Sequence, residues 1–200
     1  MAYGDFNEEE FNEFTKEVFD VLRQKLTETH RENPKVVTDI IDLHDVIHTV
    51  WSSSEKLEWF RPYCSILAYS LLSVLYFPEV GFFGIRHVLE AAWKRLSNRV
   101  GSFRRPDWVD SLFMKKDLVY GRLSEIVHAK ASPPDSLDER ARLCVDCVDV
   151  ILAILAGYLS WELGRKDLVL ALSEEDYELL KHSVEKLNMQ FAKSMFSFAD

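Results

Sequence analysis

Arg122 and His128 are the two residues of this sequence whose types and spacing point most directly to chemistry on a phosphate. They lie six positions apart, and Pro133 and Pro134 follow soon after them. A guanidinium is permanently charged and pairs with phosphate oxygens in a fork geometry, and an imidazole holds or releases a proton near neutral pH. The pair therefore has the groups needed to cleave an RNA backbone without a metal ion. The alternative is that Arg122 is a solvated surface residue and that His128 packs near a helix end.

Basic residues gather around this pair. From Lys94 to Lys130, nine Lys and Arg stand against four Asp and Glu, a local charge of +5 in a chain whose net charge is −9. Because salt limits each surface charge to a range of about 8–10 Å, a basic segment can attract a polyanion even in an acidic protein. The alternative is that this segment is only a solvated face.

Two further clusters have residue types that bind metals or react. His44 and His48 are four positions apart and so share a helix face, with Asp45 between them. No third ligand follows at the usual spacing, and a histidine pair on a polar helix face is the simpler interpretation. Cys144 and Cys147 form a single pair, whereas a structural zinc site needs four ligands, and they continue an apolar pattern. We therefore predict core cysteines, no metal site and no cofactor.

The elements that must position these residues are helices. Apolar residues recur at spacings of three and four along nearly the whole chain, and no stretch shows sustained β alternation. The expected helices cover about residues 8–29, 34–52, 61–77, 82–98, 108–114, 116–129, 137–163 and 173–198. This predicts an all-α fold, an up-and-down bundle of four to five core helices with additional N-terminal and C-terminal helices. With 200 residues, 48% of them hydrophobic, the chain suits a single helical domain spanning residues 1–200.

The first predicted helix carries an aromatic stripe of Phe6, Phe11, Phe14 and Phe19, with acids between. Such a stripe is more often core or interface than a platform for bases, so we expect it to pack against the bundle or a second subunit. The acidic N-terminal helices are also suited to docking a basic protein partner.

Neither export nor a membrane is predicted. The most apolar runs, residues 66–77 and 148–161, are shorter than the roughly 20 residues of a spanning helix. The N-terminus has no secretory signal, and three cysteines make an odd count that does not suit a disulfide framework. These features predict a cytoplasmic protein.

The order of these elements resembles the HEPN superfamily, helical bundles that carry an Arg followed by a His after four to six residues. Arg122-x5-His128 fits this pattern. The preceding segment 82–94, which has a Glu beside alanines and a following Lys, is similar to the family's earlier helix, and the helix after Pro134 corresponds to its later one. The resemblance covers about residues 62–163, an expected HEPN-like core that follows an N-terminal helical extension, residues 1–60. The chain departs from the family at Leu123, where catalytic members commonly carry a polar residue, often Asn.

The resemblance implies a metal-independent endoribonuclease whose Arg/His motifs from two subunits meet across a homodimer interface. His128 would act on the proton of the attacking 2′-hydroxyl or of the leaving 5′-oxygen, and Arg122 would stabilise the charge building on the phosphate. The candidates for holding the RNA backbone are Arg95, Arg99, Arg104, Arg105, Lys115 and Lys116, while Tyr120 either stacks on a base or only packs.

The same superfamily also includes non-catalytic members that bind nucleotides or partner proteins. Examples are the helical companions of minimal nucleotidyltransferases, and a toxin–antitoxin type of system is another setting for such a module. A pure interaction protein, and a metal hydrolase at His44 and His48, are the remaining alternatives.

Overall fold

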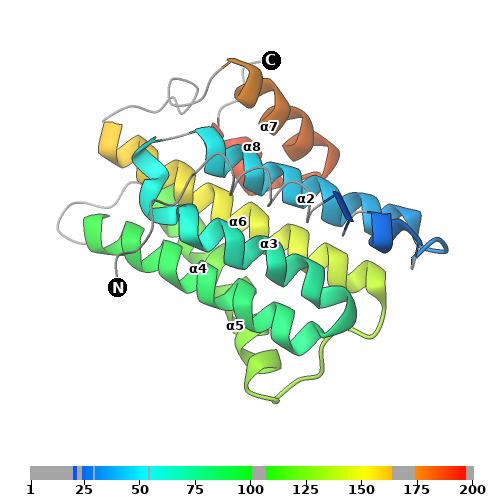
Figure 1. The fold of residues 1–200 in the computed structure, drawn as a ribbon. Helices are drawn as coiled ribbons and strands as arrows, with labels where there is room; N and C mark the ends of the chain where they lie inside the picture. Colours follow the sequence, from blue (N-terminus) through cyan, green and yellow to red (C-terminus); the bar gives the residue numbers. More distant parts are fainter. Residues whose placement is uncertain are drawn as a thin grey trace, which may run out of the picture.

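The computed structural model describes residues 20–21, 24–28, 30–53, 55–100, 107–163 and 174–196. Over these residues the chain is an all-α helical bundle, which confirms the predicted fold class (Figure 1). Its elements are α2 (Pro34–Ser53), the 3-10 helix η1 (Glu55–Phe60), α3 (Arg61–Tyr76), α4 (Pro78–Val100), α5 (Asp107–Val127), α6 (Leu137–Leu163), α7 (Glu174–Lys186) and α8 (Gln190–Phe196). None of the described helices is long and apolar enough to cross a membrane. The aromatic stripe predicted for residues 6–19 lies outside the described residues.

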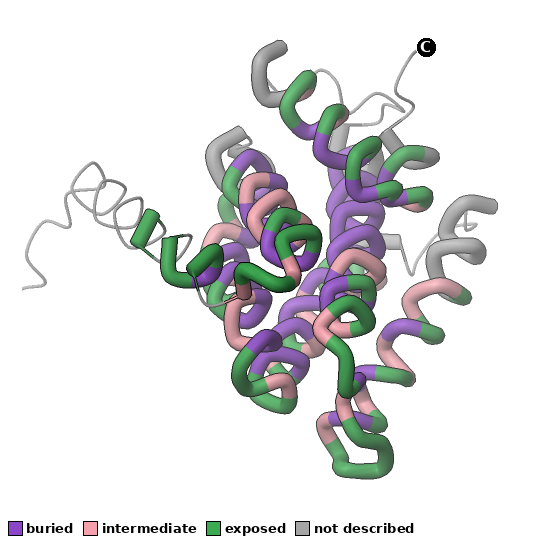
Figure 2. The backbone as a smooth tube through the Cα atoms, turned by 90° about the vertical axis from the view of Figure 1, so that its right-hand side faces the viewer, coloured by how far each residue is buried: buried purple, intermediate pink, exposed green. Residues whose placement is uncertain are grey.

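The centre of the bundle is α6, which packs against α2, α4, α5 and α8. Every residue from Cys147 to Leu159 is buried, the pattern of a helix surrounded by other helices (Figure 2). The Ser136 hydroxyl accepts a hydrogen bond from the N–H of Glu139 and so caps the N-terminus of α6. Both residues of this cap lie within one turn of sequence. The bounds of this helix agree with the predicted 137–163.

The start of α4 differs from the prediction, which placed a break at Pro78 and Gly81 and the helix at 82–98. Proline is compatible with the first helical turn, where its missing N–H would have no partner, so the helix begins at Pro78. Gly81 lies inside the helix, at a position where α3 passes so close that there is no room for a side chain. A methyl group there would lie 2.5 Å from Val74 Cγ2 and 2.7 Å from the Ser70 carbonyl oxygen. This glycine therefore marks a close helix contact and not a helix end.

Two other predicted boundaries are wrong. The helices expected at 108–114 and 116–129 are one helix, α5, which continues through Lys115 and Lys116. Conversely, the single helix expected at 173–198 is divided into α7 and α8. The division falls at Asn188, whose φ of 54° lies in the left-handed region that ends helices.

Candidate nucleic-acid interface

Arg122 and His128 are both exposed near the C-terminal end of α5. The His128 N–H still donates to the Ser124 carbonyl, and Ala129, with φ 53°, then turns the chain out of the helix. Leu123, by contrast, is fully buried, with 0% of its surface exposed. A side chain at position 123 therefore faces the core.

An exposed apolar stripe on α5 leads to Arg122. Met114 and Leu118 are 69% and 73% exposed, and they precede Arg122 at intervals of four residues. Residues at this spacing share one face of a helix. Arg122 therefore extends a surface that is suited to contact with another molecule.

Three of the predicted nucleic-acid-binding residues, Lys115, Lys116 and Tyr120, take part in contacts between helices. The Tyr120 hydroxyl accepts a hydrogen bond of 2.6 Å from the Arg86 guanidinium on α4. Lys116 Nζ lies 4.9 Å from the Trp93 ring centre and 5.5 Å from that of Tyr120. Lys115 Nζ lies 5.9 Å from the ring centre of Phe191 on α8. These three side chains are half-buried and help to join α5 to its neighbours.

Arg95 is exposed on α4, but the bundle holds it well away from His128. The contacts of Arg86 with Tyr120 and of Trp93 with Lys116 show that α4 and α5 run antiparallel. Arg95 lies nine residues beyond Arg86 in one direction, and His128 lies eight residues beyond Tyr120 in the other. At the helical rise the two are separated by roughly 25 Å along the bundle. The Arg99 side chain, Arg104 and Arg105 lie outside the described part of the chain.

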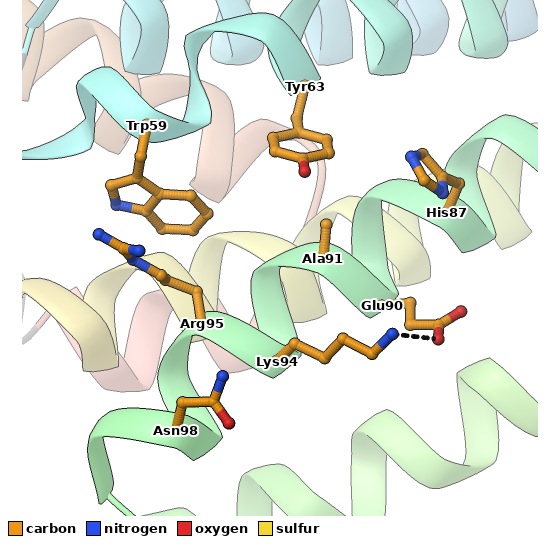
Figure 3. A pocket seen from close by; sticks show the side chains of 8 residues that line it. All are labelled: Trp59, Tyr63, His87, Glu90, Ala91, Lys94, Arg95 and Asn98. Carbon is orange, nitrogen blue, oxygen red and sulfur yellow. Dashed lines mark ion pairs between the residues drawn. The ribbon is translucent and has the colours of Figure 1, made fainter.

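Arg95 instead lines a groove between the η1–α3 segment and α4 (Figure 3). The groove has a volume of about 510 Å³, which is in the range of small-ligand sites. The lining residues are Trp59, Tyr63, His87, Glu90, Ala91, Lys94, Arg95 and Asn98. The α4 members recur at intervals that place them along one side of that helix, and Figure 3 shows the two aromatic rings facing them from the other wall.

Aromatic contacts fix one end of the groove. The Trp59 ring packs edge-on against Tyr158 of α6, with ring centres 5.3 Å apart. The Arg95 guanidinium carbon lies 5.4 Å from the Trp59 ring centre and 5.9 Å from that of Tyr158, a cation–π arrangement that orients the guanidinium. Trp59 Nε1 is buried and has no hydrogen-bond partner among the described residues.

The charged groups of the groove give it a small positive balance. Lys94 Nζ pairs with a Glu90 carboxylate oxygen at 3.0 Å. The hydrogen bond from Lys94 holds the pKa of the Glu90 carboxyl below its ordinary value, so this residue is ionised at neutral pH. The pair neutralises itself, and Arg95 adds one positive charge. At the other end, His87 and Tyr63 lie with ring centres 6.0 Å apart.

Of the groove residues, only Arg95 was among the predicted binding residues. The spacing of His87, Lys94 and Asn98 on a predicted helix was a signal for a shared face. Trp59 and Tyr63 come from about 30 residues earlier in the chain. No local pattern indicates that their rings would face α4.

The sites considered for metal or thiol chemistry have other environments. His44 is buried, with 6% of its surface exposed, whereas His48 is exposed. Within the described ranges, no group of three or more His, Cys, Asp and Glu side chains is placed to hold a metal ion. Cys144 and Cys147 are fully buried, which confirms that they pack in the core. Burial raises the pKa of both thiols well above the ordinary value.

A comparison of the chain with models of known families, with curated proteins and with solved structures finds no significant match. The resemblance to the HEPN superfamily therefore depends on the Arg122–His128 motif and the order of the helices. The groove beside α4 and the exposed pair at the end of α5 are two separate candidate sites.

Proposed function

We propose that this chain is a HEPN-like helical module that binds single-stranded RNA, with one nucleotide seated in the groove beside α4. The observation that carries the proposal is the combination of Trp59, Tyr63 and His87 with Lys94 and Arg95 around one groove. Aromatic rings beside cations suit a nucleotide, because the planar base can stack on a ring and the anionic phosphate can pair with a cation.

The base and the phosphate have separate partners in this arrangement. Tyr63 and His87 offer ring surfaces on which a base can stack, a contact that contributes about 1–3 kcal/mol per base. The Arg95 guanidinium, oriented by Trp59, presents two N–H groups to phosphate oxygens. Lys94 supplies a second charge as the phosphate replaces Glu90 as its partner. The Asn98 amide can donate to and accept from the sugar or the edge of the base.

The test is binding of a short fluorescein-labelled oligouridine, followed by anisotropy at several salt concentrations. We expect affinity to fall with salt, and Arg95→Ala to weaken binding by roughly tenfold or more, since a charge-assisted hydrogen bond contributes about 1.5–3 kcal/mol. Lys94→Ala should weaken it less. Lys193→Ala and Arg31→Ala are the matched controls, because both side chains are exposed outside the groove. Equal losses in the groove and control variants, or no binding by the wild type, would contradict the proposal.

A second candidate function is cleavage of RNA by Arg122 and His128 in a composite site at a homodimer interface. It is favoured by the exposure of both side chains at the same end of α5. Within the described part of the chain, no side-chain hydrogen bond or ion pair engages either of them. The guanidinium of Arg122 and the imidazole of His128 are both open to a phosphate.

Cleavage of single-stranded RNA in the presence of a chelator tests this second candidate. His128→Ala should abolish cleavage while the helical circular dichroism spectrum stays unchanged. The control is His182→Ala, which alters an exposed histidine on α7. An inactive wild type, or a His128→Ala protein that cuts as fast as the wild type, would exclude cleavage and leave the binding proposal intact.

A further inference from the structure

The α3–α4 hairpin exposes an unusual amount of apolar surface. Of the ten exposed large hydrophobic side chains in the described part of the chain, six lie on this hairpin. Their exposed fractions run from 38% for Ile66 to 67% for Phe77. The six, called the hairpin face below, are Ile66, Tyr69, Tyr76, Phe77, Val80 and Phe83.

The floor of the hairpin face is shallow and offers few free polar groups. Four of its members surround a groove of about 390 Å³ between the two helices, whose floor includes Ser70, Ser73 and Gly84. The Ser70 hydroxyl donates to the Ile66 carbonyl at 2.6 Å, and that of Ser73 donates to the Tyr69 carbonyl at 2.8 Å. Because both hydroxyl donors are already used, the surface favours apolar contact.

The area of this face is what an interface core needs. An aromatic side chain presents about 150–250 Å², so the exposed parts of the four aromatic residues amount to roughly 400 Å². Monomeric proteins rarely expose contiguous apolar patches larger than a few hundred Å². In a standard interface each partner contributes about 800 Å², somewhat more than half of it apolar. The exposed aromatic surface of the hairpin face would therefore supply nearly all of the apolar area that one partner contributes to such an interface.

We propose that the partner on the hairpin face is a second copy of this chain, in a two-fold symmetric dimer. Glu79, Phe83 and His87 follow one another at intervals of four residues on α4 and so share one stripe, and all three are exposed. An apolar residue lies midway between an acid and a histidine, whose ring N–H can donate a hydrogen bond to a carboxylate. This order is complementary to itself when two such stripes meet in opposite directions.

In a two-fold interface every contact between different residues occurs twice. Phe83 packs against Phe83 of the partner subunit at the symmetry axis. Glu79 then lies beside His87 of the partner subunit, and His87 lies beside Glu79 of the partner subunit. Glu79, Phe83 and His87 include no Lys or Arg, the residues that helices binding anionic membranes place beside their apolar face. The next cation on this side of α4, Lys94, is already paired with Glu90. A second copy therefore suits this surface better than a lipid bilayer does.

The dimer leaves most of the RNA groove accessible. His87 borders both surfaces, but Lys94 and Arg95 lie about three helical turns further along α4 than Phe83 and do not line the groove of the hairpin face. Dimerisation can thus be measured in the absence of RNA, and its outcome does not depend on RNA binding in the groove beside α4.

The molar mass of the full chain, measured by sedimentation equilibrium over a wide concentration range, tests the dimer. We expect the wild type to dimerise and Phe83→Glu to raise the dissociation constant by at least roughly thirtyfold, the loss typical of a hot-spot residue. Phe83 is 57% exposed, so this variant should keep its helical spectrum. The control is Leu118→Glu, which places the same charge at a 73% exposed leucine on α5 and should leave the dimer unchanged.

A charge exchange tests the two-fold pairing itself. Glu79→Lys alone should weaken the dimer, and adding His87→Glu should restore it. A wild type that stays monomeric at the highest concentration would overturn the proposal. So would a dimer that Leu118→Glu dissociates and Phe83→Glu does not, since the interface would then lie on α5. If the protein is monomeric and binds phosphatidylcholine vesicles, the hairpin face is a lipid-binding surface, and this result would also overturn the dimer proposal.

Discussion

The carboxylate of Asp149 on α6 accepts a hydrogen bond of 2.6 Å from the backbone N–H of Ala192 on α8, 43 residues further along the chain. Its other oxygen accepts from the N–H of Phe191 at 3.1 Å. The first N–H groups of a helix have no partner within the helix, so Asp149 caps α8 from a distant element. Asp149 is itself buried, with 4% of its surface exposed. A polar contact in the core thus fixes where α8 lies against α6.

Removal of this cap should destabilise the protein. We expect Asp149→Ala to lower the free energy of unfolding by about 1–3 kcal/mol, because the N–H groups of Phe191 and Ala192 would be left without an acceptor in the interior. Asp149→Asn keeps one acceptor oxygen and should cost less. Urea unfolding measures both, with Asp146→Ala on the same helix as the control. An Asp149→Ala protein as stable as the control would show that α8 does not depend on the cap.

The same carboxylate should make stability depend on pH. Burial raises the pKa of Asp149, and this outweighs the lowering by the N–H groups of Ala192 and Phe191 and by nearby Lys115. A group whose pKa is higher in the folded state contributes stability that is fully present below its unfolded pKa and lost as pH rises through the folded one.

Because other carboxylates titrate in both proteins, the quantity to measure is the difference between the wild type and Asp149→Asn. The stability of the wild type relative to this variant should increase as pH falls from about 7 to about 4, near the ordinary pKa of Asp. Urea unfolding at several pH values gives this difference. The opposite slope would mean that the hydrogen bonds outweigh burial and that the folded pKa is lowered.

Alanine substitutions at Gly81, which lies against α3, and at Gly121, which lies in an open part of α5, should have opposite effects on stability. Gly81→Ala places a methyl group 2.5 Å from Val74 Cγ2 and 2.6 Å from its backbone nitrogen, so it should cost about 1–3 kcal/mol. Gly121→Ala meets no atom within 4 Å and should stabilise α5 by up to about 1 kcal/mol. Thermal unfolding compares the two variants. Equal effects would mean that the helices separate easily at Gly81.

The three cysteines should be unreactive in the folded protein. Burial raises the pKa of the Cys64 thiol to about 12 and holds those of Cys144 and Cys147 well above the ordinary value, so the nucleophilic thiolate is scarce. Titration with a chromogenic disulfide reagent at pH near 8 should detect no thiol in the native state and all three in denaturant. A fast native reaction would show that one of these sites opens.

Those helix boundaries that depend on neighbouring residues could be predicted from the sequence, whereas those that depend on contacts between helices could not. The α6 helix has its N-terminal cap at Ser136, acids in its first turn and a long apolar run, and its predicted bounds agree with the structure. Pro78 and Gly81 are each compatible with two interpretations. A proline can end one helix or begin the next, and a glycine can end a helix or allow a second helix to pass close by. The helices predicted at 108–114 and 116–129 are one helix in the structure, where Lys116 lies against the rings of Trp93 and Tyr120.

The sequence by itself determined the helical periodicity, the buried thiols and the Arg122–His128 motif, because each depends on residues within a few turns of one another. Only the tertiary structure decided which residues share a site. The hairpin at Phe77 and Pro78 returns α4 alongside α3, and this brings Trp59 to within cation–π distance of Arg95, 36 positions later in the chain. The antiparallel packing of α4 and α5 separates Arg95 from His128. The periodic pattern that reveals a helix lies within a few turns of sequence, whereas the groove, the cap at Asp149 and the hairpin face depend on packing between elements that are distant in sequence.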